Sequence, residues 1–203
     1  MGSSISEWAL LGFGASSMQG VGDPEGGFFR RLEALQPKSG GKSTFHNQGI
    51  GGNTTREMLA RLPAAQAVRA RTTVILLGCN DLPRAGDKNP AHRTELAEYG
   101  ANLEKIFRAL ECSNKIFISS FLPDLKRSGL LPETFEAYME AACALAAKHD
   151  WKIWDLYRES KGWGGTYLAD DGMHFGASGH ALIAEKLAYM LWPERAPSVG
   201  PIA

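Results

Sequence analysis

The sequence has few cysteines, no excess of either charge and no long apolar segment. Its three cysteines, Cys79, Cys112 and Cys143, are widely spaced and form no C-x-x-C motif, so we expect reduced thiols in the core. Lysine plus arginine number 22, as do aspartate plus glutamate, which leaves no basic field for nucleic acid or anionic lipid. No apolar run approaches the ~20 residues of a membrane span. We therefore expect a small-molecule partner, no nucleic acid and no membrane span.

Motifs for metals and nucleotides are also missing. No H-E-x-x-H sequence or cysteine cluster indicates a metal, and no G-x-S-x-G elbow indicates the other large esterase fold. Residues 12–17 resemble a dinucleotide fingerprint, but Ser17 stands in place of its third glycine and no acid closes the second predicted strand. Residues 40–43 resemble a phosphate loop, but Gln36 replaces its first glycine. We expect no metal and no cofactor.

The length and the amino terminus lead to two further expectations. At 203 residues the chain fits one domain, 1–203, with a core at about 7–192 and an irregular, proline-rich tail at 193–203. The amino terminus lacks the basic and apolar regions of a secretory signal, so we expect a cytoplasmic protein. The sequence leaves its oligomeric state unknown.

Five short apolar segments alternate with amphipathic helical patterns. The predicted strands cover residues 8–13, 44–50, 72–77, 115–121 and 151–156. The predicted helices cover residues 28–35, 55–70, 96–110, 132–148 and 182–191, and the second is expected to bend at Pro63. This alternation predicts an α/β fold, a three-layer α/β/α sandwich around a five-stranded parallel sheet with right-handed crossovers.

Polar or glycine-rich clusters follow the predicted strands, where open parallel sheets bind ligands. Ser16 follows the first strand, Gly52 the second and Asn80 the third. Asp171 and His174 lie in the loop after the fifth strand. Because the carboxyl ends of parallel strands meet at one edge of the sheet, we expect these residues to converge there.

The residue types in these clusters fit acyl transfer, which needs a nucleophile, a base, a group that orients the base, and donors for the oxyanion. Ser16, His174 and Asp171 fill the first three roles, since an aspartate can hold one imidazole N–H and leave the other nitrogen free. The predicted oxyanion donors are the backbone N–H groups of Ser16 and Gly52 and the side-chain amide of Asn80.

Four blocks in order carry the most specific signal. They are GASSMQG at 14–20, NQGIGGNT at 47–54, GCND at 78–81 and DGMH at 171–174. Together they resemble the G-D-S-x-x-x-G, N-x-G-x-x-G-x-T, G-x-N-D and D-x-x-H blocks of the SGNH, or GDSL, hydrolase family. The resemblance implies a flavodoxin-like SGNH hydrolase fold and a metal-independent serine esterase or lipase with an acyl-enzyme intermediate.

One position departs from the family pattern. Ala15 stands where the first block usually has an aspartate. That aspartate does not perform the chemistry in the family, so we expect altered local hydrogen bonding rather than loss of catalysis.

Several alternatives remain open within the predicted site. Ser17 competes with Ser16 as the nucleophile, although the spacing from Gly14 to Gly20 favours Ser16. Four other histidines compete with His174 as the base: His46, His92, His149 and His180. Only His174 has an aspartate at the fitting spacing within the last block; His180 is expected to cap or pack, and His92 lies near a loop that borders the pocket.

Two other functions fit the same sequence. A carbohydrate O-acetylesterase would bind a sugar against aromatic side chains, for which Trp163, Tyr167 and Phe175 near the base are candidates, and a place in the core fits these three residues equally well. A non-catalytic ligand-binding module could share the fold. Loops at 82–89 and 126–131 are expected to shape the pocket, but the substrate-binding residues stay unknown.

Overall fold

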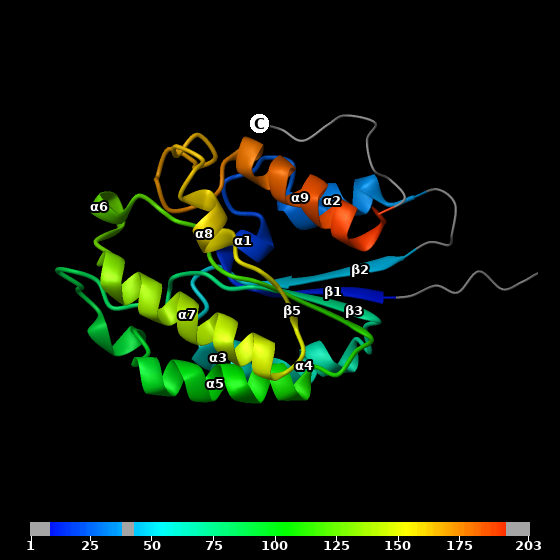
Figure 1. Cartoon of the computed structure of the whole chain (residues 1–203), viewed down its shortest axis with the longest axis horizontal. Coiled ribbons are helices and arrows are strands. Elements are labelled where there is room, and N and C mark those ends of the chain that lie inside the picture. The colour runs from blue at the N-terminus through cyan, green and yellow to red at the C-terminus, as the bar shows by residue number, and fades with distance from the viewer. Residues whose placement is uncertain (1–8, 38–42, 194–203) are drawn as a thin grey trace, which may run out of the picture.

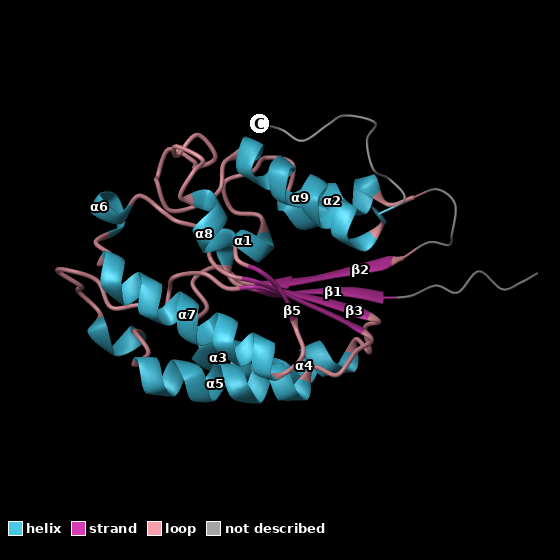
Figure 2. Ribbon diagram, viewed as in Figure 1, coloured by secondary structure: helices cyan, strands magenta, loops and turns pink. Residues whose placement is uncertain are grey.

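A five-stranded parallel sheet forms the middle layer of the molecule (Figures 1 and 2). The computed structural model describes residues 9–37 and 43–193. The strands are β1 (Ala9–Gly14), β2 (Thr44–Gly49), β3 (Thr72–Leu76), β4 (Asn114–Ile118) and β5 (Lys152–Trp154), in the order β2-β1-β3-β4-β5. All neighbouring strands are parallel. This is the flavodoxin-like order, and the predicted α/β fold is confirmed.

The central strands are apolar because helices cover both of their faces. All five residues of β3 are buried, and Leu10, Leu11 and Phe13 of β1 are at most 1% exposed. The edge strand β2 contains Thr44, His46 and Gln48 and has no buried residue. This difference follows from position, since an edge strand meets solvent and needs fewer apolar side chains.

Four helices cover one face of the sheet (Figure 1). They are α1 (Ser16–Gln19), α2 (Gly27–Leu35), α8 (Leu156–Ser160) and α9 (Ala177–Leu191). Phe28 and Leu32 of α2 and Ile183 and Leu187 of α9 share one buried cluster with Leu76 of the sheet. Each such side chain contributes roughly 1.5–3 kcal/mol when fully buried, so this layer fixes α2 and α9 firmly on the strands.

The opposite face carries the second helical layer (Figure 1). It consists of α3 (Thr55–Ala60), α4 (Leu62–Ala67), α5 (Leu96–Ala109) and α7 (Pro132–Lys148). Phe13, Ile75 and Phe117 of the sheet pack in one cluster with Tyr99 and Phe107 of α5. Two short elements, the 3-10 helix η1 (Pro90–His92) and α6 (Leu125–Ser128), lie in the connecting loops.

The helix predicted at 55–70 is instead two helices, so the expected bend at Pro63 is wrong in position. The chain breaks at Arg61, where φ is −101° and ψ is 9°. Pro63 falls in the first turn of α4, where its missing N–H leaves no helical hydrogen bond unmade. Arg61 itself is the residue that joins the two helices.

The sequence pattern also missed three short helices, α1, α6 and α8, of four or five residues each. Such helices show no measurable apolar period. The fifth strand is shorter than predicted because Asp155 caps α8 by accepting a hydrogen bond from the Arg158 N–H. Trp8, residues 40–42 and the tail at 194–203 lie outside the described residues, so the expectations made for them stay predictions.

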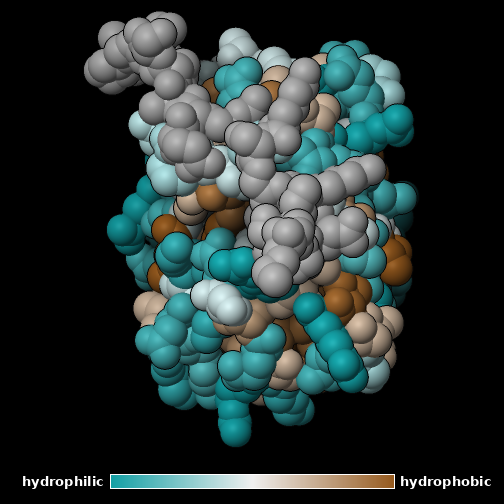
Figure 3. Space-filling view, turned by 90° about the vertical axis from the view of Figure 1, so that its right-hand side faces the viewer, coloured by the Kyte–Doolittle hydropathy of each residue, from teal (hydrophilic) through white to brown (hydrophobic). Residues whose placement is uncertain are grey.

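All three cysteines are free; Cys79 is buried, and Cys112 and Cys143 are partly buried. No helix within residues 9–37 and 43–193 has the length and apolarity needed to cross a membrane. Figure 3 shows the end of the molecule at which the strands begin, opposite their carboxyl ends. Hydrophilic and apolar residues are mixed over the part of this face that described residues form.

Gly49→Ala tests the contact between β2 and α1. A Cβ at Gly49 would lie 2.1 Å from the Gln19 nitrogen and 2.5 Å from the Met18 carbonyl carbon, both backbone atoms. We expect this substitution to lower the free energy of unfolding by roughly 1–3 kcal/mol, as overpacking does. A Cβ at Gly100, in α5, would meet only Leu145 Cδ1 at 3.8 Å, so Gly100→Ala should instead add up to ~1 kcal/mol. Urea denaturation measures both; unchanged stability of Gly49→Ala would contradict the packing.

Candidate active site

Ser16 begins helix α1 two residues after strand β1 ends. Gly14, two residues before Ser16, must be a glycine, because a Cβ there would lie 2.3 Å from the Leu76 carbonyl oxygen of β3. Gly20 ends α1 in the left-handed conformation, with φ of 98°. This short, tightly packed helix holds Ser16 at the carboxyl edge of the sheet, with 9% of the residue exposed.

His174 and Asp171 reach Ser16 from the loop between α8 and α9. His174 Nε2 lies 3.0 Å from Ser16 Oγ, and His174 Nδ1 lies 2.6 Å from Asp171 Oδ2. Asp171 Oδ1 also accepts the backbone N–H groups of Met173 at 2.8 Å and His174 at 2.9 Å. The aspartate therefore fixes both the turn and the imidazole ring.

The environment of Asp171 keeps its carboxylate ionised. Partial burial opposes ionisation, but the hydrogen bonds from the His174 ring and from the Met173 and His174 N–H groups outweigh it and lower the pKa to about 2. An ionised carboxylate against Nδ1 keeps the proton on that nitrogen. His174 Nε2 is then free to accept the proton of the Ser16 hydroxyl.

The turn that follows β2 passes beside Ser16. A Cβ at Gly51 would lie 4.0 Å from Ser16 Cβ, and the Gly51 N–H donates to Gln19 Oε1 at 2.7 Å. Gly52 has φ of 77°, a conformation that favours glycine. The N–H groups of Ser16 and Gly52 meet no acceptor in the described part of the chain. They are therefore available to a ligand.

Asn80 lies on the loop after β3, at the same edge. Its Nδ2 donates to the Asn53 carbonyl oxygen at 3.0 Å, which leaves the second N–H of the amide for another acceptor. Arg93 Nη1 donates to the Asn80 carbonyl oxygen at 2.7 Å and so holds its backbone. Gly78 lies between this amide and Ala15, because a Cβ at Gly78 would be 3.5 Å from both Ala15 Cβ and Asn80 Nδ2.

The segment that contains all these groups matches a known family. The model of the GDSL-like Lipase/Acylhydrolase family covers residues 12–182. The chain belongs to this family. Its reaction class is therefore that of a GDSL-type esterase or acylhydrolase. A search of curated protein sequences gives no significant match.

Solved structures show how widely this acylhydrolase fold is shared. The lipase/acylhydrolase from Enterococcus faecalis has a TM-score of 0.77 at 22% identity, covering 95% of this chain and 100% of that one. Axe2, an acetylxylan esterase from Geobacillus stearothermophilus, has a TM-score of 0.76 at 20% identity, with 97% and 100% covered. LAE5, from the Lake Arreo metagenome in Spain, has a TM-score of 0.72 at 19% identity, with 93% and 97% covered. At these identities the likeness concerns the fold.

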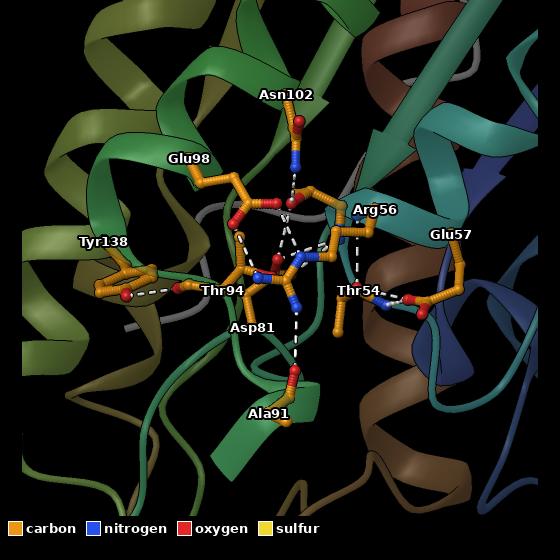
Figure 4. A network of polar contacts seen from close by, with 10 residues as sticks. Thr54, Arg56, Glu57, Asp81, Ala91, Thr94, Glu98, Asn102 and Tyr138 are labelled. Carbon is orange, nitrogen blue, oxygen red and sulfur yellow. Dashed lines mark hydrogen bonds and ion pairs between the residues drawn. The ribbon is translucent and has the colours of Figure 1, made fainter.

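A buried carboxylate supports the Asn80 loop of this GDSL-type acylhydrolase. Asp81, only 4% exposed, accepts the Thr55 N–H on both oxygens at 3.0 Å and the Thr55 hydroxyl at 2.6 Å. Asn102 donates to the same hydroxyl at 3.2 Å (Figure 4). Burial raises the pKa of Asp81. Asp81, the residue after Asn80, thus joins this loop to the first turn of α3.

The same network closes the amino end of α3 (Figure 4). Thr54 caps the helix and forms a capping box with Glu57. Arg56 pairs with both oxygens of Glu98 at 2.7 Å and donates to the Ala91 carbonyl oxygen at 3.0 Å. These contacts fasten η1 to α3, so the loop after Asn80 is held at both ends.

A second polar cluster supports the chain after Ser16, and the sequence reasoning missed it. Asp23 binds Arg31 through both oxygens, at 2.6 and 2.9 Å, and accepts the N–H groups of Glu25 and Gly27. His180 is fully buried, accepts the Phe28 N–H on Nδ1 and lies 3.1 Å from the Val21 carbonyl oxygen through Nε2. Burial lowers the pKa of His180. His180 packs, as expected, and it holds the loop that leaves α1.

The other candidate nucleophile and bases lie apart from this arrangement. Ser17 is 3% exposed on α1, and no histidine of the described residues bonds its hydroxyl. His46 lies on β2, and His149 Nε2 lies 2.9 Å from Glu104 Oε1. His92 Nε2 lies 3.3 Å from the Gly52 carbonyl oxygen, so it contacts the predicted oxyanion turn rather than Ser16.

The aromatic residues proposed as a sugar-binding wall belong to the core. Phe175 is 0% and Tyr167 5% exposed, and their rings pack against Phe121. The half-buried Trp163 packs edge-on against Tyr167 at 5.0 Å between ring centroids. Of the two alternatives open for these residues, packing therefore favours the core for Phe175 and Tyr167, although Tyr167 also borders the pocket beside Gly172.

The two predicted pocket loops contact each other. Arg84 and Leu130 form an antiparallel bridge, and the Ala85 N–H donates to the Gly129 carbonyl oxygen at 2.8 Å. Residues 82–89 and 126–131 therefore form one structural unit. A substitution in one loop is expected to shift the other.

Acidification tests the Asp23–Arg31 pair. The hydrogen bonds from Arg31 lower the pKa of Asp23 from 3.8 to about 2 against the effect of burial. The ionised pair therefore stabilises the fold above pH 4 by about 2 kcal/mol, and this contribution is lost as the pH falls through 2. Asp23→Asn should lower the free energy of unfolding most above pH 4, with the difference narrowing toward pH 2.

Denaturation of both proteins between pH 2 and 7 measures this difference. Glu25→Gln is the matched control, because Glu25 also contacts Arg31 but its side chain is 68% exposed. Its effect should stay within about 0.5 kcal/mol. A difference for Asp23→Asn that does not change with pH would show that charge pairing is not its source.

Proposed function

We propose that this acylhydrolase is a serine ester hydrolase that acts through an acyl-enzyme intermediate. Ser16 is the nucleophile, His174 the general base and Asp171 the group that orients the base. The observation that supports this most is the unbroken chain of contacts from Asp171 through His174 to Ser16, of 2.6 and 3.0 Å. Both distances fit proton transfer to Nε2 and retention of the proton on Nδ1.

The reaction follows from this arrangement. Ser16 Oγ attacks the ester carbonyl carbon while His174 Nε2 takes the hydroxyl proton. The carbonyl oxygen becomes negative and accepts hydrogen bonds from the N–H groups of Ser16 and Gly52 and from Asn80 Nδ2. The intermediate then expels the alcohol, which receives the proton from His174. Water attacks the acyl-enzyme by the same route and releases the acid and Ser16.

The substrates proposed first are carboxylic esters of small or lipid-like alcohols. The family contains lipases and esterases, and the similar Enterococcus faecalis protein is described as a lipase/acylhydrolase. A small-molecule ester substrate also agrees with the balanced charge of the chain, which offers no field for a polyanion.

A carbohydrate O-acetylesterase is the second candidate, and one feature of the molecule favours it. An open pocket of about 450 Å³ borders Gly172, the residue after Asp171. Its lining mixes apolar residues, such as Leu122 and Leu168, with the polar or charged Asp124, Arg127 and Lys161. The polar side chains among them can hydrogen-bond the hydroxyl groups of a sugar, which an acyl chain lacks. Axe2, with the same fold, is described as an acetylxylan esterase.

Ser16→Ala tests the nucleophile and, with a panel of esters, the substrate class. Hydrolysis of p-nitrophenyl esters from acetate to long chains and of acetylated xylo-oligosaccharides should fall by at least ~10³-fold, because a hydroxyl must form the acyl-enzyme. Ser17→Ala is the neighbouring control and should keep activity within about tenfold. Full activity in folded Ser16→Ala would reject the nucleophile. A wild-type protein inert on every ester would favour a non-catalytic binding module.

Asn80→Ala tests the oxyanion assignment. Removing one donor should lower kcat by ~10²- to 10³-fold, because the donor acts on charge that develops in the transition state. KM and the melting temperature should change little, since within the described residues the Asn80 side chain makes a single hydrogen bond, to Asn53. Steady-state kinetics at equal folded concentration measure this effect. An unchanged kcat would remove Asn80 from the oxyanion hole.

A further inference from the structure

Arg61 joins three segments at the carboxyl edge of the sheet. Its guanidinium donates to the Gly14 carbonyl oxygen at 2.6 Å, the Gln48 carbonyl oxygen at 2.7 Å and Asn53 Oδ1 at 2.7 Å. The guanidinium carbon also lies 4.5 Å from the centre of the Phe13 ring. All of its nitrogens are therefore used, in the fixed fork that only arginine has.

The residues that Arg61 contacts adjoin two of the proposed oxyanion donors and bind the third. Gly14 is the last residue of β1 and lies two residues before Ser16. Gln48 lies near the end of β2, which leads into the turn with Gly52. Asn53 accepts Asn80 Nδ2 on its backbone oxygen and Arg61 Nε on its side-chain oxygen. Arg61 thus bonds to residues near Ser16 and Gly52 in the chain, and to the residue that accepts the Asn80 amide.

The electrostatic setting of Arg61 is unusual for a structural arginine. The residue is partly buried, and burial lowers its pKa. All three of its acceptors are neutral oxygens, and it forms no ion pair with a carboxylate of the described residues. Holding a cation away from water without an anion is costly. The positive charge is therefore left unneutralised beside the turn where the proposed oxyanion forms.

We propose that Arg61 is a positioning residue for the oxyanion hole. This inference rests on the function proposed above. Its three hydrogen bonds set the spacing between the Ser16 turn, the Gly52 turn and the Asn80 amide. Oxyanion donors must lie about 2.7–3.1 Å from the charged oxygen, and a displacement of ~1 Å can cost ~10²-fold in rate. Its charge adds a favourable potential for the negative transition state.

The test compares Arg61→Met and Arg61→Lys with the wild type by steady-state ester hydrolysis at equal folded concentration. Arg61→Met keeps the length of the side chain and removes all three donors, so kcat should fall by ~10- to 100-fold with KM within about threefold. Arg61→Lys keeps the charge and restores part of the loss, because an ammonium cannot reach three divergent acceptors. Arg158→Met is the control, since the exposed Arg158 side chain, 69% accessible, forms its ion pairs within the described residues with Glu140 and Asp155 on the surface.

The outcomes separate this inference from the proposed function. A lowered kcat with unchanged KM and partial recovery in Arg61→Lys supports it. An unchanged kcat in folded Arg61→Met overturns it, as does a change confined to KM. If Arg61→Met does not fold, full kcat in Arg61→Lys overturns it instead. Failure of the proposed function shows separately, as a wild-type enzyme without esterase activity or a fully active Ser16→Ala.

Discussion

The hydrogen bond between His174 Nε2 and Ser16 Oγ joins two residues that are 158 positions apart in the chain. It forms only if the turn after β1 and the loop before α9 meet at one edge of the sheet. Parallel strands provide that edge, because all their carboxyl ends point the same way. The close approach of the segments depends on glycines: Gly14 lies against β3 and Gly49 against α1, where any side chain would collide with backbone atoms.

Buried polar groups keep this edge rigid. Asp81, Asp23 and His180 are each at most 8% exposed, and each accepts a backbone N–H group at the start of a helix that follows a loop of the site. A buried polar group without a partner costs about 1–3 kcal/mol, so a loop that leaves such a contact loses stability. The loops therefore have one favoured position, which is the requirement for donors that must act without reorganisation.

The sequence predicted the parts of the molecule that local patterns encode. The five strands and the clusters that follow them were readable because apolar runs and glycine-rich turns are local. Arg61 and Asp23 were not identified, and the partners of His180 were not, because Arg61 and His180 have their partners on other elements and no motif fixes their spacing. For Tyr167 and Phe175 the sequence left a wall and a core equally open, since an aromatic residue near a loop fits either and only packing decides. The domain limits and the cytoplasmic location stay predictions.

Membership of the GDSL-like family gives the reaction class, whereas the choice between lipid-like and carbohydrate esters depends on loops whose chemistry varies within one fold. The central claim is that His174 activates Ser16. Reaction with a fluorophosphonate followed by peptide mass spectrometry tests it most directly, because such a probe bonds only to an activated serine. If His174 activates Ser16, we expect a label on Ser16 in the wild type and none in His174→Gln. A label on Ser17, or one on Ser16 that persists at the same rate in His174→Gln, would contradict it.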